Sequence, residues 1–126
     1  MPFYLIIGAV NAMIAVALGA FGAHGLQGKV EEKYIAVWET GVQYQMYHAL
    51  ALLVIGVLMS QSLFGEQPLL KWAANLFIIG IIFFSGSLYV TTLMGGGLGK
   101  FGLITPLGGV LFLVGWVIFI IAIVKR

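Results

Sequence analysis

Four long apolar segments, separated by short polar stretches, decide what this chain can fold into. They cover residues 3–23, 41–62, 72–94 and 104–124. A membrane-spanning helix needs about 20 mainly apolar residues, because a rise of about 1.5 Å per residue must cover roughly 30 Å of hydrocarbon. Each segment meets that length. The sequence therefore predicts an all-α membrane protein, with residues 1–126 forming a single integral membrane domain built as a bundle of four transmembrane helices.

Composition and charge exclude several other classes of protein. The chain is 62% hydrophobic and 8% charged, whereas about a quarter of the residues of an ordinary soluble domain are charged. Its six basic residues are scattered among the loops, so there is no basic patch for nucleic acid. The chain contains no cysteine, which rules out disulfides and thiolate metal sites.

The first apolar segment combines small residues with one polar side chain. No Lys or Arg precedes Lys29, so a cleaved signal peptide is not expected and the segment is interpreted as a retained helix. Its small residues follow spacings of four, three and four and share one helical stripe on which another helix can pack closely: Gly8, Ala12, Ala15 and Gly19. Asn11 lies near the middle of this helix, where an interhelical hydrogen bond is favoured over contact with a solute.

The stretch before the second span is amphipathic. Val30, Tyr34 and Trp38 share one face, and Trp and Tyr favour the headgroup region of a bilayer. We therefore expect a short surface helix over residues 30–38 that turns into the membrane near Gly41.

The second span carries the residues most suited to a site. Gly41, Gln45 and His48 follow i, i+4, i+7 spacing and share one face. One interpretation is that these groups make interhelical hydrogen bonds. The alternative is a binding crevice or a permeation path, because ionisable groups within spans usually face a bundle interior or a cavity. The candidate crevice residues, with Glu39 near the mouth, are Glu39, Gln43, Gln45, His48, Ser85 and Ser87.

Residues that could support catalysis or cofactor binding are scarce. The chain has no Asp and no Gly-x-Ser-x-Gly motif, and the glycine-rich segment 95–102 lacks the residues of a P-loop. The two histidines, His24 and His48, match no compact metal-ligand spacing. We therefore expect no enzyme activity, no cofactor and no metal. Trp116 lies at mid-span, where its indole N–H needs an acceptor such as a Thr hydroxyl or a helix carbonyl.

Several motifs, in order along nearly the whole chain, carry a family resemblance. They are Gly19 to Leu26, Trp38-x-Thr40-Gly41, Tyr44-Gln45-x-Tyr47-His48 with the following Ala49 to Leu52, Phe84 to Tyr89, Ile104 to Gly109, and Gly115-Trp116. With these motifs the chain resembles the small bacterial membrane-protein family of the YgdD and YwdK type, "domain of unknown function 423", and is also similar to a small mitochondrial transmembrane protein of animals. The resemblance implies a four-span, multi-pass protein of the bacterial plasma membrane. The family is uncharacterised, so it implies no site residues.

Two functions remain open from the sequence. The first is a non-enzymatic protein whose bundle binds a lipid, a quinone or a partner helix, so its partners would be membrane lipids, a further copy or another membrane protein. The second is a small oligomeric transporter or channel for a solute or ion, since polar mid-span groups suit either function. The basic residues are divided equally between the two sides of the predicted bundle, so the positive-inside rule does not fix the orientation.

Overall fold

The structure is a computed structural model that describes residues 2–60, 67–95 and 102–125. Its elements are all helical: α1 (Phe3–His24), α2 (Glu32–Ser60), α3 (Pro68–Gly80), η1 (Ile81–Ser85), α4 (Gly86–Leu93) and α5 (Ile104–Lys125). The described residues form four stretches that are long and apolar enough to cross a membrane, with α3, η1 and α4 joined into one of them. The prediction of an all-α membrane protein with four spans is therefore confirmed.

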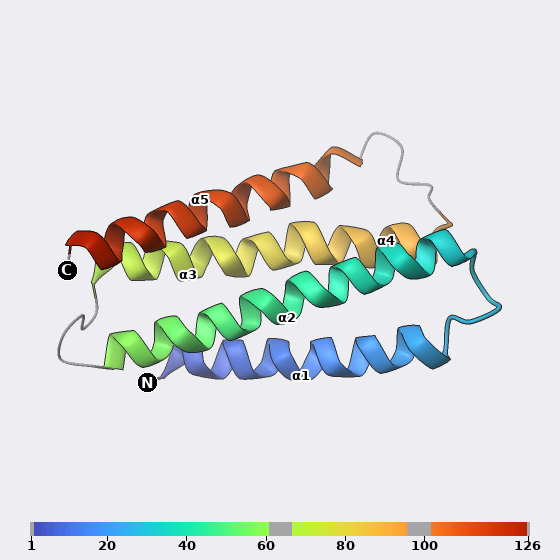
Figure 1. Cartoon of the computed structure of the whole chain (residues 1–126), viewed down its shortest axis with the longest axis horizontal. Coiled ribbons are helices and arrows are strands. Elements are labelled where there is room, and N and C mark those ends of the chain that lie inside the picture. Colours follow the sequence, from blue (N-terminus) through green and yellow to red (C-terminus); the bar gives the residue numbers. More distant parts are fainter. Residues whose placement is uncertain (1, 61–66, 96–101, 126) are drawn as a thin grey trace.

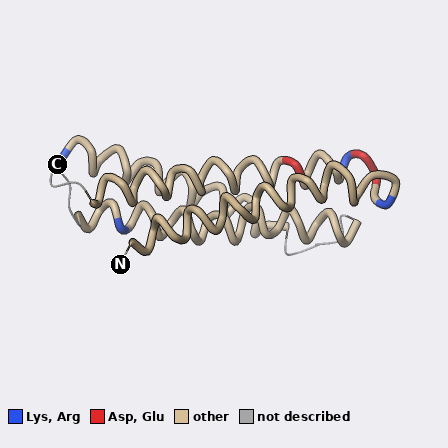
Figure 2. The backbone as a smooth tube through the Cα atoms, turned by 90° about the horizontal axis from the view of Figure 1, so that it is seen from below, with Lys and Arg blue, Asp and Glu red and all other residues tan. Residues whose placement is uncertain are grey.

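The four spans lie alongside one another in a long bundle (Figure 1), with α1 packed mainly on α2 and α5 mainly on α3 and η1. The second span also contacts α3, η1 and α4, so it joins the two helix pairs. Both described ends of the chain lie at the same end of the bundle. The charged residues of the described part lie toward the two ends and leave the middle of the bundle uncharged (Figure 2).

The expected surface helix over residues 30–38 is wrong. Residues 32–38 belong instead to α2, which continues without a break from Glu32 to Ser60 through Gly41. The reason lies in what the apolar face contacts. Ile35 and Trp38 are buried and pack with Leu26 in a small cluster, so this face binds the bundle and not the headgroups. At about 1.5 Å per residue, α2 is longer than the hydrocarbon layer is thick.

The small-residue stripe of α1 lies against α2. A side chain added at Gly8 would place its Cβ 2.9 Å from the Ala49 carbonyl oxygen, and one added at Gly19 would lie 3.3 Å from Val42. Ala15 is fully buried, and Ala12 is half-buried. The helix that packs on the stripe is therefore α2 of the same chain.

The third span contains a π-helical turn. The segment η1 breaks the regular i to i−4 pattern between α3 and α4, and such turns inside α-helices often mark functional positions. Here the turn also lies close against α5, since a Cβ at Gly108 would overlap the backbone of Phe84. Below it, Phe77, Leu52 and Ile55 lie fully buried in the main apolar core.

Candidate functional site

Gln45 of α2 is the centre of a hydrogen-bond chain that joins three spans. Its Nε2 donates to Asn11 Oδ1 on α1 at 3.0 Å, and its Oε1 accepts from the Tyr89 hydroxyl on α4 at 2.7 Å. The Asn11 amide nitrogen donates in turn to the Ile7 carbonyl oxygen at 2.9 Å. Gln45 is 5% exposed, so both ends of its amide are satisfied away from solvent. This is the interhelical bonding expected for Asn11.

Ser85 and Trp38 also link neighbouring helices near Gln45, each by a hydrogen bond to a backbone carbonyl oxygen. The Ser85 hydroxyl, fully buried, donates to the Gly41 carbonyl oxygen at 2.6 Å, and the Trp38 indole N–H donates to the Leu18 carbonyl oxygen at 2.8 Å. The ring of Tyr89 lies 4.7 Å from that of Trp38. Gly41 leaves room for the Tyr89 ring, because a Cβ there would lie 2.9 Å from it.

His48 occupies a separate, aromatic environment one turn further along α2. Its Nδ1 lies 2.8 Å from the Tyr44 carbonyl oxygen, and its Nε2 lies 3.1 Å from the Trp116 indole nitrogen of α5. A carbonyl only accepts and an indole N–H only donates, so these partners fix a neutral imidazole with its proton on Nδ1. The ring stacks on Phe112 at 3.6 Å with an interplanar angle of 7°. Both ring nitrogens are therefore paired, and the acceptor for Trp116 is this imidazole and not the expected hydroxyl or carbonyl.

The remaining candidate residues lie away from Gln45 and His48. The Ser87 hydroxyl, on α4, donates a hydrogen bond to the Phe84 carbonyl oxygen and is also hydrogen-bonded to the Thr105 hydroxyl of α5. Gln43 is exposed on the outer face of α2. Glu39 is also exposed, beside a small hollow of about 240 Å³ near the start of α2. The structure thus brings Gln45, His48 and Ser85 into the bundle interior and leaves Glu39 and Gln43 outside it.

Sequence reasoning missed the partners that complete these bonds. No pattern in the sequence pairs Tyr89 with Gln45, or Trp116 with His48. Each pair is separated by 44 or 68 residues. The only signal in the sequence was chemical: a tyrosine within a span, like a tryptophan, needs a hydrogen-bond partner when buried.

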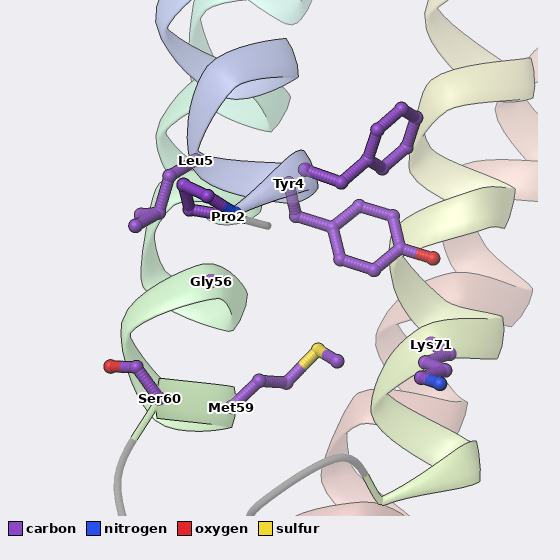
Figure 3. Close-up of a pocket in the computed structure, with 8 residues that line it drawn as sticks. Pro2, Tyr4, Leu5, Gly56, Met59, Ser60 and Lys71 are labelled. Atoms are coloured by element: carbon purple, nitrogen blue, oxygen red, sulfur yellow. The ribbon is translucent and has the colours of Figure 1, made fainter.

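A larger pocket lies at the end of the bundle that holds the two described chain ends. It has a volume of about 530 Å³, and eight residues of the first three spans line it (Figure 3): Pro2, Phe3, Tyr4, Leu5, Gly56, Met59, Ser60 and Lys71. Tyr4 and Met59 extend toward α3, which carries Lys71. The Tyr4 hydroxyl donates to Asn75 Oδ1 at 2.8 Å and so links α1 to α3 beside the pocket.

This pocket combines an apolar wall with a cationic rim. Phe3 and Met59 supply hydrocarbon, and Lys71 supplies a positive charge. The last turn of α5, which carries Lys125, lies at the same end of the bundle; the acidic residue Glu66 lies outside the described residues. The pocket was not predicted from the sequence, because its lining comes from three separate helix ends.

Comparison with known proteins decides the family. The family described as "Protein of unknown function (DUF423)" matches residues 18–109. The chain belongs to this family. It is 52% identical over 125 residues to a UPF0382 membrane protein of Staphylococcus aureus (strain bovine RF122), a match that covers 99% of this chain and 98% of the relative. It is also 48% identical to the UPF0382 membrane protein YwdK of Bacillus subtilis, over the same shares of the two chains.

These relatives carry a description of location and none of activity. A UPF0382 membrane protein of Staphylococcus epidermidis is likewise 49% identical over 125 residues. No solved structure matches the chain. The protein is therefore a membrane protein of an uncharacterised family, and a function for it has to come from its own geometry.

Proposed function

We propose that the protein is a non-enzymatic, lipid-binding protein of the bacterial cell membrane, and that the pocket among the ends of α1, α2 and α3 takes one anionic phospholipid. The observation that carries the proposal is the composition of this pocket. Phe3 and Met59 form an apolar wall, and Lys71 stands at the rim. Acyl carbons are favoured against the wall, and the ammonium group attracts a phosphate.

The position of the pocket suits a lipid headgroup. Its lining comes from the first residues of α1, the last residues of α2 and the first turns of α3. Helix ends of membrane-spanning segments lie at the bilayer surface, where headgroups lie as well. A lysine at this level is compatible with both water and lipid phosphate. A quinone has no anionic head, so the lysine favours a phospholipid over a quinone.

The interior polar groups give less support to the alternative of a transporter or channel. The amide nitrogen and oxygen of Gln45 and both ring nitrogens of His48 are hydrogen-bonded to partners within the chain. A permeation path needs groups that can bind the passing solute. In an oligomeric transporter, such a path would have to run between copies of the chain.

The test is to mix the protein, purified in detergent, with phosphatidylglycerol or phosphatidylcholine and to measure the bound lipid by native mass spectrometry. Lys71→Gln should weaken phosphatidylglycerol binding about fivefold, since a lysine near the surface contributes about 1 kcal/mol to binding an anionic lipid. Lys125→Gln removes the same charge at the same end of the bundle, outside the pocket, and is the matched control.

Equal effects of the two substitutions would refute the proposed site, as would equal binding of the two lipids by the unmodified chain. A neutral quinone that displaces bound lipid, with no dependence on Lys71, would assign the pocket to quinone instead. Solute flux in proteoliposomes that neither substitution alters would support the transporter.

A further inference from the structure

The outer face of α2 carries polar side chains at a depth that corresponds to the hydrocarbon layer of the bilayer. Gln43 and Tyr47 are both exposed, the latter to 54%. Leu50, Val54 and Val57 continue the same face toward the end of the helix and are each about half exposed. In the described part of the chain, neither the Gln43 amide nor the Tyr47 hydroxyl has a hydrogen-bond partner.

The depth of Gln43 follows from the packing of α2 on α1. Val42 lies against Gly19, and Gln45 bonds to Asn11. Gln43 is therefore level with the stretch of α1 between these two residues, which contains the midpoint of that 22-residue helix. An exposed amide at this depth faces hydrocarbon, where an unpaired polar group is costly.

The other spans do not share this feature. The exposed side chains in the middle of α1 are apolar, as with Met13 and Val16. On α3 the exposed Asn75 accepts a hydrogen bond from Tyr4, and on α5 the exposed Trp116 donates one to His48. Among the described residues, unsatisfied polar groups in the membrane core thus concentrate on one side of α2.

We propose that this face of α2 is covered by α2 of a second copy of the chain, in a parallel pair that hydrogen-bonds Gln43 to its equivalent. Copies inserted with the same orientation place the same residue at the same depth. A twofold axis along the membrane normal then brings identical residues together. A primary amide carries both a donor and an acceptor, so two glutamines satisfy each other.

The exposed residues also have the spacing of a helix-pair seam. One series of residues repeats every seven positions along this face, and a second series follows each of them by four positions. This heptad pattern packs two helices against each other at a shallow, left-handed crossing angle. The first series is Ala36, Gln43, Leu50 and Val57, all exposed, and the second is the half-buried Thr40 followed by the exposed Tyr47 and Val54. A buried amide in such a seam, which needs its own equivalent as a partner, sets the register of the pair.

Glu39 does not oppose this arrangement. It lies beside the seam, three residues after Ala36 and one before Thr40, so two Glu39 carboxylates do not face each other. In a parallel helix pair, a residue just before a seam position, such as Glu39, lies next to the residue five positions further along the partner helix. That residue is Tyr44, which is 37% exposed and has a hydroxyl able to donate to a carboxylate.

The absence of cysteine from the chain makes disulfide cross-linking in native membranes a direct test. Leu50→Cys places a thiol in the seam and leaves Gln43 intact, and Met13→Cys places one on the exposed face of α1, where the native residue is 65% exposed. Mild oxidation should give a disulfide-linked dimer from Leu50→Cys and only the background of random collisions from Met13→Cys.

A second substitution tests the role of the amide. Adding Gln43→Leu to Leu50→Cys should remove most of the cross-linked dimer, and Gln43→Leu alone should shift the purified protein from dimer to monomer in light scattering after size exclusion. Equal cross-linking of Leu50→Cys and Met13→Cys would overturn the proposal. So would cross-linking of Leu50→Cys to a different protein only, with a monomeric purified chain.

Discussion

The hydrogen bonds of Gln45 make a quantitative prediction about the stability of the bundle. Gln45→Leu puts an apolar side chain in place of the amide and removes the bonds to Asn11 and Tyr89, of 3.0 and 2.7 Å. Interhelical hydrogen bonds in membrane proteins average about 0.6 kcal/mol and reach about 1.7 kcal/mol. Two average bonds give a loss of about 1.2 kcal/mol in the free energy of unfolding, with an upper limit of about 3.4 kcal/mol.

The assay is reversible unfolding in mixed micelles with increasing SDS, followed by tryptophan fluorescence. Tyr89→Phe keeps the ring that packs at 4.7 Å on Trp38 and removes only the hydroxyl. A double-mutant cycle of Gln45→Leu with Tyr89→Phe should therefore return a coupling of about 0.6 kcal/mol. Tyr34→Phe is the matched control, because that half-buried ring has no hydrogen bond from its hydroxyl among the described residues.

Two outcomes would refute this reasoning. If Gln45→Leu left the unfolding free energy unchanged, the buried amide would have alternative partners of equal strength. If Tyr89→Phe cost no more than Tyr34→Phe and showed no coupling to Gln45→Leu, the hydrogen bond between α2 and α4 would contribute nothing to the stability of the bundle.

Two further predictions concern packing and the aromatic site. Ala15→Leu should destabilise the bundle by about 1 to 3 kcal/mol through overpacking, because Ala15 is fully buried in the face of α1 that packs on α2. Ala9→Leu, on the exposed side of the same helix, should leave the free energy of unfolding unchanged in the same assay. Equal effects of the two substitutions would contradict the packing. Trp116→Phe should cost about 0.6 to 1.7 kcal/mol, because it removes the donor to His48 Nε2; a loss of stability that persists when His48→Leu is already present would show that the hydrogen bond is not its cause.

The sequence contains enough to predict the four spans and the close packing of α1. Hydropathy and length are local properties, so the segments around residues 3–23 and 104–124 agree with α1 and α5 to within one or two residues. The stripe containing Gly8 and Ala15 was also visible, because spacing along a helix fixes which residues share a face. The identity of the packed partner, α2, required the structure.

Other features depend on contacts that no local pattern records. The face with Trp38 is amphipathic, but periodicity does not distinguish a face that packs on headgroups from one that packs on another helix. Helix geometry does separate Gln43 from Gln45, since two residues apart means about 200° of rotation. Grouping both in one crevice was therefore inconsistent with a single helical face, and the structure places them on opposite sides of α2.

The two glutamines show how one helix serves two kinds of contact at nearly the same depth. Gln45 is buried and joins α1 to α4 within the chain, so its loss should lower the stability of each folded monomer. Gln43 is exposed and contributes no hydrogen bond to the described fold, so packing within the chain gives no reason for a polar side chain there. If α2 forms the proposed pair, Gln43→Leu should reduce association while leaving the unfolding of dilute monomer unchanged. The opposite pattern, in which Gln43→Leu destabilises the monomer, would mean that the amide acts within one chain and would remove the physical argument for the pair.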